Sequence, residues 1–208
     1  MKKTLITLAI ASLLGLFSCS SNEQKTEQPD QVESPKDVKT FTYNPEATKV
    51  IWTGYKTTQK VGVTGQFTSF EVAGTVEADN IVDVFKNASI TIASNSVSTG
   101  NELRNGRIVK SYFGVFVNTD EIKANIVELS QTTGKIAVTL NDITNEIPVE
   151  VTITGNEIKL KGLIDINTFD GQEATDSLNY VCKDVHKGPD GVTKLWPDVE
   201  IMVKSALN

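Results

Sequence analysis

The sequence has few of the side chains that build enzyme sites and covalent scaffolds. Its 208 residues include two cysteines, Cys19 and Cys182, and one histidine, His186. If the Cys19 sulfur is covalently modified, Cys182 has no partner and no intramolecular disulfide can form. The fold must then be stabilised by its apolar core alone. We then expect Cys182 to be a small, buried apolar residue. No G-x-S-x-G, H-E-x-x-H or phosphate-cradling glycine loop occurs either.

An enzyme hypothesis would depend on the segment around His186. Cys182 lies four residues earlier, so on a helix the two would share a face and could bind a metal or act as nucleophile and base. Two such ligands do not make a structural zinc site, and neighbouring carboxylates are common in any acidic chain. The sequence therefore predicts no catalytic residue, no metal and no cofactor, and a metal- or thiol-dependent enzyme is the least favoured alternative.

Positive charge and aromatic side chains are also scarce. The chain has 20 basic and 26 acidic residues, and 7% of its residues are aromatic. Such an acidic balance predicts no nucleic-acid partner and no cationic patch for anionic head groups. A surface adhesin or carbohydrate-binding module would need a cluster of exposed rings, and Trp196 is the one plausible exposed ring.

No hydrophobic run is long enough to span a bilayer as a helix. The apolar stretch from Leu5 to Phe17 follows Lys2 and Lys3 and falls short of about 20 residues. It is typical of a secretory signal peptide, which we place at residues 1–18. Without Lys2 and Lys3 the mature chain has 18 basic and 26 acidic residues, a formal charge of −8.

The apolar run ends at Leu16-Phe17-Ser18-Cys19, which resembles the signal of bacterial lipoproteins. The resemblance implies that Cys19 becomes the acylated N-terminus and that the membrane partner is reached through this anchor. Several acyl chains hold a protein firmly where one chain holds it marginally. Ser20 is not the aspartate that retains lipoproteins at the inner membrane in some bacteria, which favours the outer membrane within the cell envelope. Residues 19–39 then form the lipidated cysteine and a disordered, polar tether.

The remaining residues, 40–208, are predicted to form one all-β domain. Apolar residues alternate with polar ones in four late segments, 135–141, 146–154, 157–167 and 198–204, as in strands with one buried face. Gly134, Asn145 and Gly155-Asn156 are expected at tight turns. Four earlier strands are expected at 49–56, 62–78, 88–94 and 121–130. Eight antiparallel strands usually close into a barrel or form a sandwich.

Two segments interrupt the strand pattern, 99–113 and 174–186. In the second, Leu178, Val181, Cys182 and Val185 form an amphipathic stripe. We expect one or two short helices that cap or plug the barrel.

Two motifs carry a family resemblance. Gly65, Phe67 and Phe70 fit the first part of the rough pattern G-x-F-x-x-F-x-G, and Gly74 follows as its last glycine, two residues later than the pattern places it. The segment SVSTGNELRN, which includes Asn101 and Arg104, fits S-I-x-T-G-N-x-x-R-(D/N), with Lys110, Ser111 and Phe113 following. Residues 48–208 therefore resemble the YceI-like family of secreted, lipid-binding, lipocalin-like barrels. Many members have a histidine where this chain has Arg107, so no histidine role is implied.

The resemblance implies an eight-stranded antiparallel barrel around an elongated pocket for a polyisoprenoid or similar amphiphile. Barrels of about eight strands can hold one small ligand. Our candidate lining residues are the large or apolar residues of the inward faces: Trp52, Phe67, Phe70, Val72, Ile90, Ile92, Ile126, Ile136, Val138, Leu140, Val149, Val151, Ile153, Leu160 and Ile164. Phe67 and Phe70 can both face inward only if the strand bends at Thr68-Ser69. Asn101 and Arg104 are expected at the barrel mouth, as ligand-binding groups or as a helix cap and a donor to loop carbonyls.

The sequence thus predicts an envelope lipoprotein that binds a long apolar ligand for carriage or storage and catalyses nothing. The alternative is an adhesion or structural module without a ligand. A homodimer stays an open alternative, as do the identity of the lipid and the choice among transport, storage and sensing.

Overall fold

The computed structural model describes residues 39–208. The predicted signal peptide, Cys19 and nearly all of the tether lie outside the described residues. Within 39–208, no helix is both long and apolar enough to cross a membrane.

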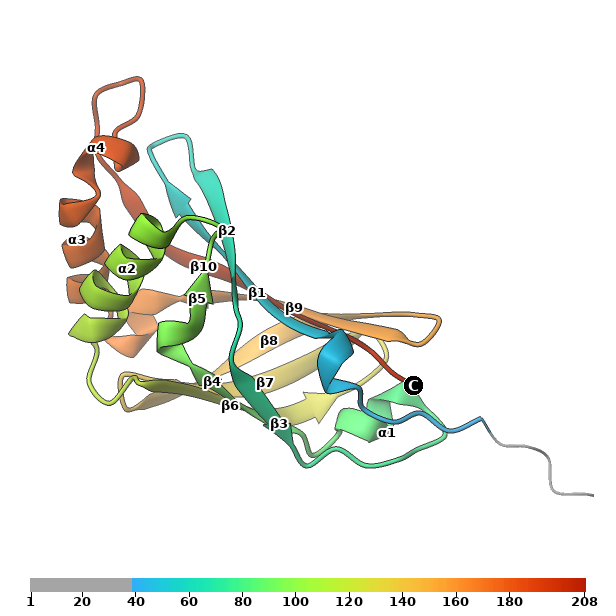
Figure 1. Ribbon diagram of the computed structural model, residues 1–208. Helices are drawn as coiled ribbons and strands as arrows, with labels where there is room; N and C mark the ends of the chain where they lie inside the picture. Colours follow the sequence, from blue (N-terminus) through green and yellow to red (C-terminus); the bar gives the residue numbers. More distant parts are fainter. Residues whose placement is uncertain (1–38) are drawn as a thin grey trace, which may run out of the picture. The chain divides into compact units, whose positions relative to one another are not determined.

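Ten antiparallel strands form one curled sheet within the described residues (Figure 1). The strands are β1 (Thr48–Lys56), β2 (Val61–Phe67), β3 (Phe70–Ala73), β4 (Ser89–Ala93), β5 (Val97–Ser98), β6 (Glu121–Leu129), β7 (Thr133–Leu140), β8 (Ile143–Thr154), β9 (Glu157–Asp165) and β10 (Leu195–Ala206). Their order across the sheet is β3-β4-β6-β7-β8-β9-β10-β1-β2-β5. The predicted all-β, antiparallel class is confirmed.

The strand count exceeds the predicted eight because one predicted strand is interrupted and because the short strand β5 lies outside the predicted strands. The segment predicted as one strand, 62–78, stops at Phe67 and resumes at Phe70, so it yields β2 and β3. Residues Ser94–Ser96 form a short 3-10 helix that separates β4 from β5. Backbone hydrogen bonds from Thr68 N to Ser96 O and from Ala93 N to Ser69 O, both 3.1 Å, join the two interruptions. The chain therefore passes from β2, near one end of the strand order, to β3 at the other end, and from β4 to β5 in the same way. The expected bend at Thr68-Ser69 is present.

Alternation of side chains explains why the late segments are strands. In β8, Ile147, Val149 and Val151 are buried, whereas the residues between them are exposed. The β8–β9 hairpin turns at Gly155-Asn156 as expected, and Gly155 has the positive φ of 63° that such a short turn needs. The expected turn at Asn145 is wrong, because the β7–β8 hairpin turns at residues 141–142, where both have positive φ and Asn145 pairs with Val138.

Gly134 was likewise expected at a turn but lies in β7, paired with Leu129 of β6. A Cβ there would approach Glu128 O to 2.9 Å, so a close backbone contact accounts for this glycine.

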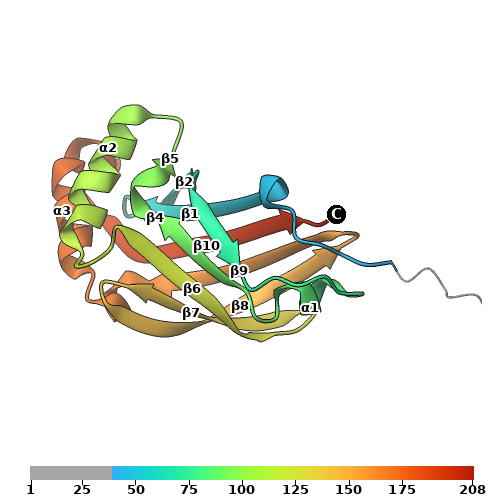
Figure 2. The same cartoon turned by 60° about the horizontal axis from the view of Figure 1, so that its bottom comes forward.

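Helices gather at one end of the sheet (Figures 1 and 2). They are α2 (Glu102–Ser111), α3 (Gln172–Val181) and α4 (Lys183–His186), and both predicted helical segments are confirmed. The second one is broken at Cys182, which ends α3 and precedes α4. A short helix, α1 (Ile81–Phe85), lies away from these helices, near the other end of the sheet (Figure 1). The 3-10 turns η1 (Pro45–Ala47), η3 (Phe113–Val115) and η4 (Ile166–Phe169) complete the elements of residues 39–208.

The buried apolar side chains form two clusters. The larger includes Val84 and Phe169, both 0% exposed, with inward residues of β7, β8 and β9. The other joins Phe67 and Val50 of the sheet to Ile108 of α2 and Leu178 of α3. The helices are thus held on the sheet by apolar contacts, and the second cluster places α2 and α3 over one end of the sheet's inner face.

Candidate ligand cavity

A cavity of about 460 Å³ lies between the inner face of the sheet and helices α2, α3 and α4. This volume is typical of sites that hold a small molecule. Apolar side chains from most of the strands line it, together with Ile108 and Leu178 from the helices. Several of them, such as Ile126 and Ile201, face inward yet stay only half-buried, because their surface borders the cavity.

Most of the predicted lining residues lie on the cavity wall. Twelve of the fifteen do so: Trp52, Phe67, Val72, Ile90, Ile92, Ile126, Ile136, Val138, Leu140, Val149, Leu160 and Ile164. Their contact with a ligand stays a prediction.

Three predicted lining residues do not reach the wall. Phe70 packs against the cluster that contains Phe67, so the bend turns both rings inward but only Phe67 borders the cavity. Val151 is 4% exposed within the larger cluster, and Ile153 packs against that cluster. Period-2 alternation identifies the inner face of a strand, but it does not tell which part of that face is packed solid and which part is hollow.

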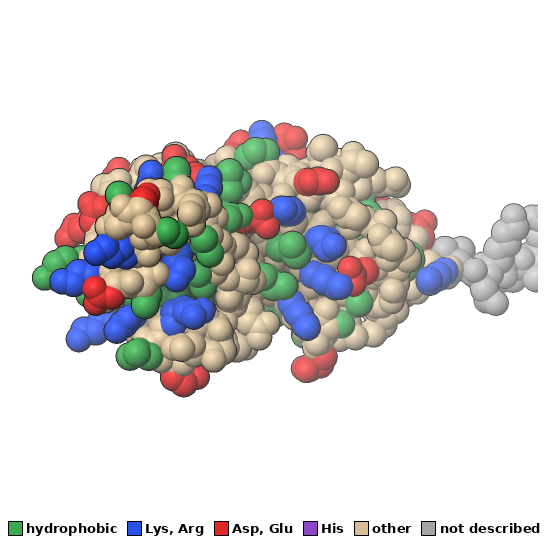
Figure 3. All heavy atoms as spheres, turned by 90° about the horizontal axis from the view of Figure 1, so that it is seen from above, with side chains coloured by type: hydrophobic (Ala, Val, Ile, Leu, Met, Phe, Trp, Pro, Cys, Tyr) green, Lys and Arg blue, Asp and Glu red, His purple; other side chains and the backbone are tan. Residues whose placement is uncertain are grey.

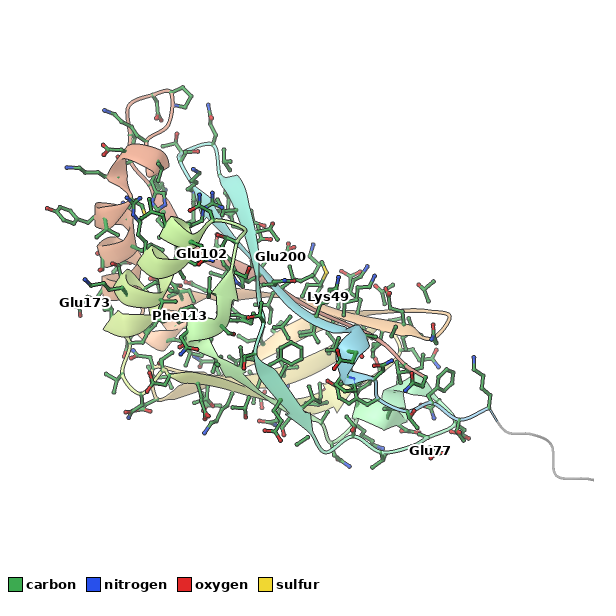
Figure 4. The ribbon with its side chains drawn as sticks, in the orientation of Figure 1. Lys49, Glu77, Glu102, Phe113, Glu173 and Glu200 are labelled. Carbon is green, nitrogen blue, oxygen red and sulfur yellow. The ribbon has the colours of Figure 1, made fainter. Side chains whose placement is uncertain are left out.

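The sequence also missed several wall residues. Val199, Ile201 and Val203 of β10 line the cavity, and their alternation was already visible in the segment 198–204. Tyr112 and Phe113 line it from the end of α2, and burial raises the pKa of the Tyr112 hydroxyl. Phe113, labelled in Figure 4, follows the helix and contacts Phe67 of the sheet with ring centroids 6.0 Å apart.

The first glycine of the G-x-F-x-x-F-x-G motif shapes the wall. A Cβ at Gly65 would overlap the indole ring of Trp52, so glycine allows this ring to lie against β2. The indole Nε1 of Trp52 is buried and has no hydrogen-bond partner among the described residues. The last glycine of the motif, Gly74, has a φ of 75°, a conformation that favours glycine.

The T-G-N-x-x-R-N motif builds the start of α2. The Asn101 side chain accepts a hydrogen bond from Arg104 N at 2.9 Å and is the N-cap of the helix. Asn105 is buried, and its Oδ1 accepts from both the backbone N and the hydroxyl of Thr99, at 2.9 and 2.7 Å. These bonds fix the chain between β5 and α2. The Arg104 side chain makes no hydrogen bond in residues 39–208 and lies, with Asn101, on the cavity wall.

Cys182 and His186 are both buried, as expected for Cys182, which is 6% exposed and has a free thiol. Nη1 of Arg107 donates to the Cys182 sulfur at 4.0 Å, and Nδ1 of His186 lies 3.0 Å from Oδ1 of Asn179. Burial, together with the charges of Lys56 and Arg107, lowers the pKa of His186 from 6.5 to about 4. The imidazole is therefore neutral at pH 7. No group of three or more metal-binding side chains occurs in the described part of the chain.

Trp196 is half-buried rather than an exposed ring. Its Nε1 donates to Thr57 O at 2.8 Å, and Lys194 Nζ lies 3.6 Å from the ring centroid. The ring also borders the cavity. It is therefore part of the cavity wall, and the prediction of an exposed ring at Trp196 is wrong.

Comparison with solved structures shows the same fold in other proteins. A polyisoprenoid-binding domain from Saccharophagus degradans, implicated in plant cell wall breakdown, is similar with a TM-score of 0.53 and 15% identity over 80% of this chain and 98% of that one. BcnA of Burkholderia cenocepacia is similar with a TM-score of 0.51 and 15% identity over 80% and 99% of the two chains. A mutant CJ YCEI protein is similar with a TM-score of 0.50 and 16% identity over 74% and 89%.

No curated protein sequence matches the chain. The model of the YceI-like domain matches residues 41–204, which is nearly the whole of the described region. The chain belongs to the YceI-like family.

Proposed function

We propose that the domain binds one long apolar chain inside its cavity, for carriage or storage, and catalyses no reaction. The observation that carries this proposal is the cavity of about 460 Å³ with an almost entirely apolar wall. Such a wall favours a hydrocarbon chain because each buried CH₂ contributes about 0.8 kcal/mol. The polyisoprenoid-binding domain of Saccharophagus degradans, which has a similar fold, supports a polyisoprenoid or related amphiphile as the ligand class.

The architecture supports one route for the ligand. In this proposal β2 and β3 act as one strand and β4 and β5 as another, so that eight strands enclose the lumen as in lipocalin-like barrels. Helices α2 and α3 then cap one end. The ligand enters beside these helices, where the cavity wall includes the exposed side chains of Leu103 and Val185.

Native mass spectrometry tests the ligand. The full chain, purified from its own envelope without delipidation, is expected to carry a bound mass that organic extraction releases as a long-chain lipid. The extracted lipid should bind again to delipidated protein in one-to-one proportion. Protein that carries no lipid and takes up neither polyisoprenoid alcohols nor fatty acids would contradict the proposal and would favour an adhesion or structural module.

We also propose that the domain is tethered to the outer membrane as a lipoprotein. The apolar run that ends at Cys19, and the polar segment after it, support this proposal. An acyl anchor would hold a lipid-binding domain near the membrane that supplies its ligand.

For Cys19, we expect mass spectrometry of the mature N-terminus to find an acylated cysteine. Cys19→Ala should move the protein from the membrane fraction to the soluble envelope fraction or leave its signal uncleaved, because the anchor's thioether cannot form. Cys182→Ala is the matched control, since its buried thiol lies within the folded domain. An unlipidated N-terminus elsewhere would show that this proposal is wrong, and so would unchanged partitioning of a Cys19→Ala protein whose signal has been cleaved.

A further inference from the structure

The few charged side chains on the cavity wall all have the same sign. They are Lys56, Arg104 and Arg107, and no aspartate or glutamate of the described residues lies on the wall. This is unexpected in a chain with 26 acidic and 20 basic residues. The net acidic charge predicted no cationic site, but net charge does not determine where individual charges lie.

Both arginines of the chain belong to this set. The sequence contains arginine only at positions 104 and 107, and every other basic residue apart from the histidine is a lysine. On α2, residues three apart lie on neighbouring turns of the same face, so the two guanidinium groups emerge side by side. A guanidinium group binds carboxylate or phosphate oxygens through two parallel hydrogen bonds, which an ammonium group cannot do.

Lys56 approaches the same place from the end of β1. Its Nζ donates to Val185 O of α4 at 2.7 Å, so the ammonium group is held between the sheet and the helices. Leu103 and Val185, which are 67% and 52% exposed, also border the cavity here. We define the mouth of the cavity as Lys56, Leu103, Arg104, Arg107 and Val185. Basic and hydrophobic side chains lie side by side over this helical end in the space-filling view (Figure 3).

The cations of the mouth are not neutralised by the protein. Among residues 39–208, every ion pair is made by a lysine other than Lys56, and none involves Arg104 or Arg107. Glu102 of α2 and Glu173 of α3, both labelled in Figure 4, do not lie on the cavity wall. Arg107 has the Cys182 sulfur as its one described side-chain partner, at 4.0 Å, and Arg104 has none. Most of their donors therefore remain available.

His186 lies on the same cavity wall as Lys56 and Arg107. Burial is the main cause of its lowered pKa, and the positive charges of Lys56 and Arg107 lower that pKa further. His186 stays neutral at pH 7 and adds no charge of its own. Where water is partly excluded, such charges act more strongly than on an open surface.

We propose that Arg104, Arg107 and Lys56 bind the anionic head group, a phosphate or a carboxylate, of the amphiphile whose apolar chain fills the cavity. This inference rests on the proposed function. It adds that the ligand is a charged amphiphile, oriented with its head at the helical end and its tail among the strands. Leu103 and Val185 then contact the first methylenes of the tail.

The test compares three probes with the same tail: hexadecyl phosphate, hexadecanoate and hexadecanol. We expect the delipidated full chain to bind the two anions at least about tenfold more tightly than the alcohol, as measured by calorimetry below the micellar concentration. The double variant R104Q/R107Q should lose this preference and keep its affinity for hexadecanol. R104K/R107K should restore part of the preference, because it keeps the charge but not the planar fork.

Lys110→Gln is the matched control. It removes a positive charge from the same helix, but Lys110 is exposed and lies away from the cavity wall, so the preference should not change.

Inorganic phosphate is a fourth probe. Binding of phosphate alone as tightly as hexadecyl phosphate would identify a site for free anions and overturn the inference. Equal affinity for all three lipids would overturn it too, and would leave the proposed function intact. Failure of every probe, hexadecanol included, would refute the proposed function itself. Loss of thermal stability in R104Q/R107Q with an unchanged head-group preference would assign the arginines a structural role.

Discussion

Ala124→Trp is expected to abolish uptake of a long apolar chain while the domain stays folded. Ala124 lies in β6, faces the cavity and is only half-buried, so an indole side chain there would extend into the lumen. Ala124 is a better site for this test than the predicted lining residue Val138, its partner in β7, because Val138 is 4% exposed and leaves little room for a larger side chain.

The measurement is affinity for hexadecanol, which depends on the tail alone, together with thermal unfolding. Affinity should fall by at least about tenfold, whereas the unfolding temperature should change little because the new ring occupies space that is already present. Lys123→Trp is the control, since it places the same ring on the exposed outer face of the same strand and should leave binding unchanged. Normal uptake by Ala124→Trp would show that the cavity is not the binding site.

Phe169→Ala is expected to lower the free energy of unfolding by about 3–5 kcal/mol. Phe169 is 0% exposed, lies in η4 and belongs to the larger apolar cluster without bordering the cavity. Truncation there leaves a void that the surrounding strands cannot fill. Equilibrium denaturation in urea measures the loss.

The same measurement on two isoleucines separates solid core from hollow lumen. Ile147 of β8 is 7% exposed and does not border the cavity, whereas Ile201 of β10 is half-buried against it. Ile147→Ala should cost at least about 2 kcal/mol, and Ile201→Ala should cost clearly less, because its side chain already lacks neighbours on one side. Equal losses would mean that the lumen is packed and could hold no long chain.

The two proposals make different demands on the molecule. Tail binding depends on volume, so it is tested by filling the lumen. Head-group binding depends on charge at the mouth, so it is tested by removing the guanidinium groups.

The outer face of the sheet carries ion pairs, such as Lys161 with Glu200 at 3.0 Å, and Glu200 and Lys49 are labelled there in Figure 4. Exposed pairs of this kind contribute little to stability, typically below about 1 kcal/mol. Most of the stability of the fold therefore comes from the two apolar clusters.

Local patterns in the sequence determined the elements of the structure. Alternation in β8, β9 and β10 identified strands and their inner faces, because successive side chains of a strand point to opposite sides. The phenylalanines at 67 and 70 implied a bend between them, since an unbroken strand would direct one of them outward. The residues from Thr99 to Asn105 placed the start of a helix, because a capping asparagine acts within its own turn. Each of these signals depends on residues close together in the chain.

Only the tertiary structure decided where the inner face is hollow and which charges meet at its opening. Val149 and Val151 occupy equivalent positions in one alternating strand, yet only Val149 borders the cavity, because packing against other segments decides where the inner face is filled. Lys56 and Arg107 are 51 positions apart in the sequence. They lie on the same cavity wall because β1 ends beside α4, where Lys56 Nζ donates to Val185 O, while the second apolar cluster holds α2 over the same end of the sheet. Periodicity reports the direction of a side chain, whereas a cavity and a charged mouth arise from distances between segments far apart in the sequence.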